Sequence, residues 1–426
     1  MLPFHRIVRC GSSFALAAVA AGLLGTGLAA AQETAGPTAE LDALLAQHTY
    51  AMKVEGRSLS GPGADWLGSQ AAAANFFLFG EQHATADIAL FAAGLFEQVH
   101  DLGYEVAAVE LGRRETPLME AMMRQDGGET FARYAGEPAH RMTFAFFSWK
   151  EEAEFALTVL RLSKRTSNAI WGLDQEFVLG GPVLVAELAR LATTDAQRGA
   201  VDAARQAVAQ DPAALGAGED GAWQRLDEAF AGNPQGSAIT AEILVSRRIY
   251  KPFTGGGGSA YLANDERERL MKTNLHAQLM AARKESGGWP KVFMKFGANH
   301  LGYGHSPTHV LSLGTFVHEI ATAHGGTSFN LMVDCAGGEG TVPQTGASER
   351  CESELLDADS DLGRYVSRDA PTLIDLRPLR SKRRLWKDWD AVSQRLIDAY
   401  DAYLALPNVK PATWISSGTA AGEAVD

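Results

Sequence analysis

Residues 75–83 read Asn-Phe-Phe-Leu-Phe-Gly-Glu-Gln-His, and residues 291–300 read Lys-Val-Phe-Met-Lys-Phe-Gly-Ala-Asn-His. In each stretch an apolar run stops at a glycine, and a histidine, His83 or His300, follows three residues later. Short apolar runs of this kind are typical of buried strands. The carboxyl ends of parallel strands form the edge at which open α/β sheets bind ligands. The two stretches therefore predict a catalytic or metal-binding centre at that edge.

Apolar runs and helical patterns alternate along most of the chain. Strands are expected at residues 76–79, 106–111, 169–173, 292–296, 310–313, 328–333 and 372–376. Helices are expected at residues 39–51, 86–102, 116–125, 151–163, 265–284 and 390–404. Such alternation predicts a three-layer α/β/α fold with a mostly parallel central sheet. Residues 182–250, rich in Ala, Glu, Arg and Leu at helical spacing, are expected to form a helical insertion.

The N-terminus has the pattern of an export signal. Basic residues come first, residues 13–28 are apolar or small, and three alanines follow at 29–31. We expect a signal peptide over 1–31, a leader helix within 32–70 and an α/β domain over 71–426, and hence a periplasmic or secreted protein. The apolar stretch is short for a spanning helix and no later stretch is long enough, so no stable membrane span is expected in the mature chain.

The formal charge of −13 limits the partners. A chain this acidic, without a basic stripe, is not expected to bind nucleic acid, and a small-molecule or peptide substrate is expected instead. The predicted mature chain keeps two cysteines, Cys335 and Cys351. In an oxidising compartment they would form a disulfide, and otherwise remain free thiols.

Carboxylates stand at the ends of three expected strands. Glu81 follows the first, while Glu110 and Asp174 stand at the ends of the next two. A buried carboxylate needs a cationic partner, a metal or a role in a site. Glu110 is therefore either a site residue or the partner of Arg113 or Arg114.

The histidines offer a general base, because imidazole titrates near neutral pH and a carboxylate can orient it. His305 and His309 follow His300 closely, a density also found in metal sites, although the intervening glycines and proline make this segment a loop. His318 is expected on a strand.

The expected helix over 265–284 carries Arg267, Met271 and Asn274 on one face. This face either points into the crevice or belongs to an ordinary charged helix. If it points inward, we expect Asn274 to contact substrate, together with Asp174 and His305.

Taken in order, these motifs resemble the superfamily that joins erythromycin esterases, ChaN-like haem-binding lipoproteins and TraB/Tiki-type metalloproteases. The Gly-Glu-Gln-His of residues 80–83 resembles the first-strand signature, and Arg267-Glu268-x-x-Met271-x-x-Asn274 is similar to the esterase helix motif. Gly297-Ala298-Asn299-His300 resembles the late histidine motif, and residues 400–413 resemble the esterase tail.

The resemblance implies a site whose catalytic residues are Glu81, His83, Glu110, Arg267 and His300. One histidine would activate a water, Glu81 or Glu110 would orient it, and Arg267 would stabilise the oxyanion or a substrate carboxylate. An exported ester or lactone hydrolase is the first expectation.

This chain departs from the esterases in two places. They usually carry a further histidine where this chain has Gly297, and their first motif has one more residue between Glu and His.

The other branches of the superfamily imply cofactors. A TraB/Tiki-like peptidase would bind a divalent metal, with Glu81, His83 and His300 as the available ligands. A ChaN-like protein would bind haem or iron, with Tyr303 and His305 as candidate ligands.

Overall fold

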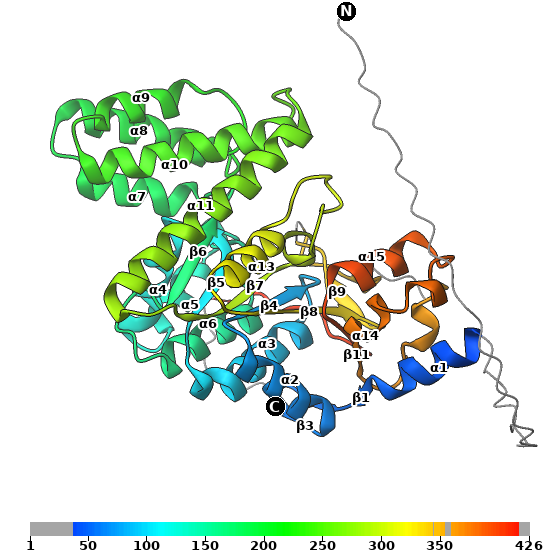
Figure 1. The fold of residues 1–426 in the computed structure, drawn as a ribbon. Helices are drawn as coiled ribbons and strands as arrows, with labels where there is room; N and C mark the ends of the chain where they lie inside the picture. The colour runs from blue at the N-terminus through cyan, green and yellow to red at the C-terminus, as the bar shows by residue number, and fades with distance from the viewer. Residues whose placement is uncertain (1–36, 344, 354–358, 417–426) are drawn as a thin grey trace, which may run out of the picture.

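An eight-stranded sheet lies between two layers of helices (Figure 1) in the computed structural model, which describes residues 37–343, 345–353 and 359–416. The expected signal peptide, residues 1–31, lies outside the described residues. The strands are β1 (Thr49–Ala51), β4 (Phe76–Glu81), β5 (Tyr104–Gly112), β6 (Ile170–Asp174), β7 (Lys291–Gly297), β8 (Ser328–Cys335), β11 (Thr372–Asp375) and β12 (Ala402–Leu406).

The strand order is β1-β11-β12-β8-β4-β7-β5-β6. From β12 to β6 all neighbouring strands run parallel. At the other end of the sheet, β11 pairs antiparallel with both of its neighbours, β1 and β12. The fold is therefore the expected three-layer α/β/α arrangement with a mostly parallel sheet. Its four strands β4, β7, β5 and β6 are consecutive, so their carboxyl ends share one stretch of edge.

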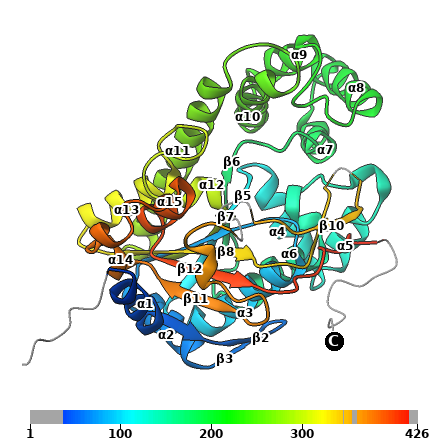
Figure 2. The same ribbon diagram turned by 90° about the vertical axis from the view of Figure 1, so that its right-hand side faces the viewer.

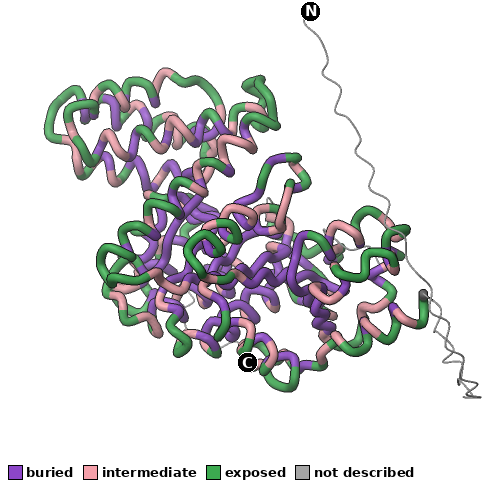
Figure 3. Tube along the Cα trace, in the orientation of Figure 1, coloured by how far each residue is buried: buried purple, intermediate pink, exposed green. Residues whose placement is uncertain are grey.

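Alternate side chains of each strand serve the two faces of the sheet. Phe77 and Phe79 of β4 pack in one core with α2 (Pro62–Ala73), α3 (Ala86–Val99) and α6 (Lys150–Leu162). Phe76 and Leu78 pack on the opposite face with α11 (Ala260–Ser286) and α13 (Leu313–Ala323). That second layer continues with α1 (Pro37–Gln47), α14 (Arg377–Arg380) and α15 (Ala391–Ala399). Burial is accordingly concentrated in the strands (Figure 3).

The segment expected to be a helical insertion forms four helices that stand apart from the sheet (Figures 1 and 2). They are α7 (Gly181–Leu191), α8 (Asp195–Gln210), α9 (Gly221–Phe230) and α10 (Pro234–Tyr250). We call them the helical lobe. The long helix α11 leads from the lobe back to the sheet and packs Met271, Leu275 and Leu279 against it.

The remaining elements surround the sheet. They are α4 (Glu115–Gln125), α5 (Glu129–Ala135), α12 (Ala298–Leu301) and two small antiparallel pairs, β2 (Lys53–Glu55) with β3 (Ser58–Ser60) and β9 (Glu339–Thr341) with β10 (Ser348–Arg350). None of the described helices combines the length and apolar character needed to cross a membrane.

Three expected elements are wrong. Residues 310–313 form no strand, because Ser312 caps a helix there, and His318 lies on that helix, α13. The expected helix over 390–404 ends at Ala399 and is followed by strand β12. The leader helix ends at Gln47, and the next residues join the main sheet as β1. β12 is buried on both faces, so its apolar run carries no period that separates a strand from a helix.

Candidate active site

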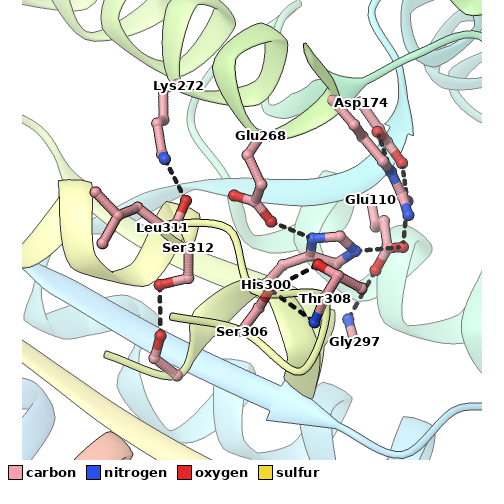
Figure 4. Close-up of polar contacts among 12 residues, drawn as sticks. Glu110, Asp174, Glu268, Lys272, Gly297, His300, Ser306, Thr308, Leu311 and Ser312 are labelled. Atoms are coloured by element: carbon pink, nitrogen blue, oxygen red, sulfur yellow. Dashed lines mark hydrogen bonds and ion pairs between the residues drawn. The ribbon is translucent and has the colours of Figure 1, made fainter. Parts of the chain in front are cut away.

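The carboxyl ends of four adjacent strands bring the expected residues together. β4 delivers Glu81 and His83, β5 delivers Glu110, β6 delivers Asp174, and β7 leads through Gly297 into the short helix α12. That helix carries His300, and α11 adds Arg267 and Glu268 from the layer above. Polar contacts join these residues into one network, part of which Figure 4 shows.

His83 lies between two carboxylates. Its Nδ1 is 3.0 Å from Glu81 Oε1, and its Nε2 is 3.4 Å from Glu110 Oε2. Its ring stacks on Phe146 with centroids 3.8 Å apart, which fixes the plane of the imidazole. Burial alone would lower the pKa of His83, but hydrogen bonds and charges from Glu110 and Glu81 raise it to about 10. His83 is therefore protonated at neutral pH.

His300 has its own carboxylate partner, which is Glu268. The Nδ1 of His300 is 2.7 Å from Glu268 Oε1, and its Nε2 is 3.4 Å from Glu110 Oε1 (Figure 4). Burial and the Arg267 guanidinium lower the pKa of His300, whereas Glu110 and Glu268 raise it, to a net value of about 9.

Glu110 is the centre of the network. It accepts hydrogen bonds from Arg267 Nη2 at 2.7 Å and from the backbone N of Gly297 at 2.7 Å. Burial alone would raise the pKa of Glu110, but His300, His83 and Arg267 hold it well below its usual range. Arg267 is itself fixed by Asp174, which its Nε contacts at 3.0 Å.

Of the two alternatives for Glu110, the one that pairs it with Arg113 or Arg114 is wrong. Arg113 pairs with Glu242, and the backbone N of Arg114 donates to Glu176. The true partner, Arg267, lies far along the chain, and only the packing of α11 over the sheet brings it to Glu110.

Gly297 permits the two histidines to converge. A Cβ at this position would lie 2.6 Å from His83 Nε2 and 3.2 Å from Glu110 Oε2. The space that a side chain would occupy is therefore filled by His83.

Beneath His83 lies a buried ion triad. The ammonium of Lys295 on β7 donates to Glu81 Oε1 and to Glu152 Oε2, both at 2.6 Å. Burial alone would raise the pKa of Glu81, but Lys295 and His83 hold it below its usual value. Burial and the nearby Glu81 raise the pKa of Glu152 to about 7. Glu81 thus stays ionised and keeps the proton of His83 on Nδ1.

Exposure differs between the cations and the anions of the network. The side chains of His83, His300 and Arg267 are 22%, 12% and 23% exposed. Those of Glu81 and Glu110 are only 2% and 8% exposed. A substrate entering this edge therefore meets N–H donors first, and the carboxylates lie behind them.

Two of the expected substrate contacts have other positions. Asn274 is buried, and its amide donates to the carbonyl of Leu173 at 2.8 Å, which ties α11 to β6. His305 is exposed, and its backbone bridges to Leu311 in the loop before α13. Asp174 lies inside the network through Arg267.

The donor set does not fit a divalent metal. Among residues 37–343, 345–353 and 359–416, no group of three or more His, Cys, Asp or Glu is placed to hold a metal ion. One expected ligand, Glu81, binds the Lys295 ammonium, and the other two, His83 and His300, each have a carboxylate at both ring nitrogens. A metal would have to displace these partners, since it binds a deprotonated imidazole nitrogen.

One of the two expected haem ligands, Tyr303, has another partner. The hydroxyl of Tyr303 donates to Asp401 Oδ2 at 2.9 Å, and burial raises the pKa of this phenol, which disfavours a phenolate.

Sequence reasoning missed three members of the network. Glu268 stands next to Arg267 in the helix motif. However, the motif does not show that the Glu268 side chain faces His300. Lys295 left a clear signal, a charge between the apolar residues Met294 and Phe296 in the interior of a strand. Glu152, at the start of α6, left none.

No family model matches this chain, and no curated protein matches it. Three solved structures resemble it across most of its length. A succinoglycan biosynthesis protein has 12% identity and a TM-score of 0.58, covering 88% of this chain and 98% of that one. A Bacillus cereus protein has 13% identity and a TM-score of 0.55, covering 86% and 97%. An erythromycin esterase variant, EreC, in its open conformation has 13% identity and a TM-score of 0.54, covering 86% and 99%.

Proposed function

We propose, on the premise of an erythromycin esterase-like fold, that this protein is an exported hydrolase that cleaves carboxylic esters or lactones. The observation that carries the proposal is a pair of histidines that are each oriented by a carboxylate, His83 by Glu81 and His300 by Glu268. The Nε2 atoms of both histidines point at Glu110. Two imidazoles that face one point supply a base and an acid for hydrolysis.

The environments of the two histidines assign their roles. Burial and the Arg267 guanidinium oppose the protonation of His300, so we assign it the role of base. His83 lies between Glu81 and Glu110, which favour its protonated form, so we assign it the role of N–H donor. Titratable groups whose environments separate their pKa values divide the acid and base roles in this way.

The reaction then follows without a further co-reactant. His300 removes a proton from a water, and the hydroxide attacks the ester carbonyl carbon. The protonated His83 stabilises the oxyanion that forms. Collapse of the intermediate breaks the bond to the alkoxy oxygen, which takes the proton from His300. Arg267, whose guanidinium is bound by Asp174 and Glu110, holds Glu110 in place.

The test is hydrolysis of p-nitrophenyl acetate and a panel of lactones by the mature chain. His300→Ala should lower kcat at least about 100-fold, because it removes the base, and the cooperative unfolding transition should remain. His276→Ala, an exposed histidine on α11, serves as the matched control and should retain full activity. Activity that survives His300→Ala would rule out this site.

Elemental analysis and an absorption spectrum of the purified protein separate the alternatives. A stoichiometric divalent metal that is lost in Glu81 and His300 variants would replace the proposal with a metal-dependent peptidase or hydrolase. A Soret band would replace it with haem binding. Export is tested by fractionation and by the mass of the mature N-terminus, which we expect near Gln32.

A further inference from the structure

The two residues that flank His83 are held by one distant segment of the chain. The side-chain amide of Gln82 accepts a hydrogen bond from the backbone N of Cys335 at 3.3 Å and donates to the carbonyl of Glu352 at 2.7 Å. Its side chain thus bridges two points that lie far apart in sequence. Gln82 itself is 9% exposed, so water does not readily replace these contacts.

Those two points are joined covalently. Cys335 and Cys351 form a disulfide with Cα atoms 6.4 Å apart, and Glu352 is the next residue. The backbone N of Cys351 also donates to the carbonyl of Gly338 at 3.0 Å. The disulfide therefore closes a loop that contains β9 and β10, which we call the disulfide hairpin (residues 335–351).

The same hairpin holds the residue after His83. Ala84 has a φ of 69°, in the left-handed region, and its carbonyl accepts from the backbone N of Thr341 on β9 at 2.9 Å. The backbone N of Ala412 also donates to it, at 3.2 Å. An alanine keeps such a conformation only where its surroundings determine it. Here β9 of the disulfide hairpin is one of those surroundings.

We propose that the disulfide hairpin is the positioning element of His83: by holding Gln82 and Ala84 on either side, it keeps the imidazole between Glu81 and Glu110, so that activity depends on the Cys335–Cys351 bond. This inference rests on the proposed hydrolase function for its kinetic consequence, but the placement of His83 is measurable without any substrate.

Activity would then also depend on whether Cys335 and Cys351 are oxidised or reduced. Reduction by dithiothreitol transfers two electrons and two protons to the Cys335–Cys351 bond, which gives two thiols and the cyclic disulfide of the reagent. The bond is buried, at 2% and 7% exposure of its cysteines, so a variant without it is the cleaner probe.

The experiment compares the native protein with a variant that carries both Cys335→Ser and Cys351→Ser. We expect kcat for p-nitrophenyl acetate to fall about 10-fold or more with KM changed less than about 2-fold, because binding groups stay in place while His83 moves. The second readout is the imidazole NMR signal of His83, identified by its loss in His83→Gln. It should shift or broaden in the variant, and the His300 signal should not.

A double-mutant cycle excludes a general loss of stability. Gln82→Leu keeps the disulfide but removes both amide contacts, so its effect on kcat should not add to that of the cysteine variant. Gln197→Leu is the matched control. Gln197 is also a buried glutamine that binds backbone groups, at the start of α8 in the helical lobe, and its removal should leave kcat and the His83 signal unchanged.

The outcomes separate the two proposals. An unmoved His83 signal, or additive effects in the cycle, would overturn the positioning role. A moved signal in a protein that hydrolyses no ester would uphold the positioning role and overturn the hydrolase.

Discussion

At the scale of single residues, the site is built from pairs in which a buried carboxylate fixes the proton of an imidazole. His83 and His300 each have one ring nitrogen on such a carboxylate and the other directed at Glu110. The sequence placed both histidines and two of the carboxylates at strand ends. It did not identify Glu268, because no local pattern says which residue on a helix faces a distant loop.

Glu268→Gln tests the second pair. Loss of the negative charge beside Nδ1 should lower the pKa of His300 from about 9, so the rise of kcat/KM with pH should shift to lower pH by about one unit. The maximal kcat should fall about 10-fold, because the amide orients the ring less well. The measurement is the pH dependence of ester hydrolysis.

Glu266→Gln is the control for that change. Glu266 lies two residues earlier on α11 and pairs with Arg248 at the surface, 2.8 Å away. The pH dependence of kcat/KM in Glu266→Gln should match that of the native protein. An unchanged profile in Glu268→Gln as well would show that His300 is not the base.

At the scale of elements, the site depends on how closely the loops after β4 and β7 approach each other. The two strands are neighbours in register, with Glu81 opposite Gly297. A glycine is required at 297 for a steric reason and not a conformational one, because its φ is −53°, which any residue adopts.

Gly297→Ala should therefore act on activity more than on the fold. The added methyl would lie 2.6 Å from His83 Nε2, so the imidazole must leave its place, and kcat should fall about 100-fold. The urea unfolding midpoint should change little, because the His83 side chain yields and the backbone does not.

Gly199→Ala in the middle of α8 is the matched substitution. No atom lies within 4 Å of a Cβ built there, so the change should stabilise the protein by up to about 1 kcal/mol through helix propensity and leave kcat unchanged. Equal kinetic effects at both glycines would contradict the steric argument.

At the scale of the whole molecule, buried ionisable groups couple stability to pH. Burial raises the pKa of Glu152 to about 7 and that of Glu176 to about 8, and carboxylates raise those of His300 and His83 to about 9 and 10 against burial. Each folded value lies above the ordinary one, so each group stabilises the fold at low pH and loses that contribution as pH rises through its folded value.

The free energy of unfolding should therefore decline steadily from about pH 5 to about pH 10. As pH falls below about 4, the free energy of unfolding should also decline. The fold lowers the pKa values of Glu81 and Glu110, so protonation of these carboxylates favours the unfolded state. Urea unfolding across this range measures the curve. Glu152→Gln should remove about 3 kcal/mol of the decline between pH 4.5 and about pH 7.

Glu154→Gln, on the same helix, is the control. Glu154 pairs with Arg57 nearer the surface. Its loss should change the free energy of unfolding by the same amount at every pH, so the slope of the curve should not change. If the slope is unchanged in Glu152→Gln, Glu152 is ionised in the folded protein at every pH in this range.

The sequence by itself predicted the layers, most strand ends and most residues of the polar network, because strand and helix periods and glycine stops are local properties of the chain. It also indicated that two cysteines could pair. Only the tertiary structure decided which residues meet: Arg267 with Glu110, Glu268 with His300, and Lys295 with Glu81 and Glu152. The physical reason is that burial and pairing, which set the charge of each group, depend on contacts between segments far apart in the chain.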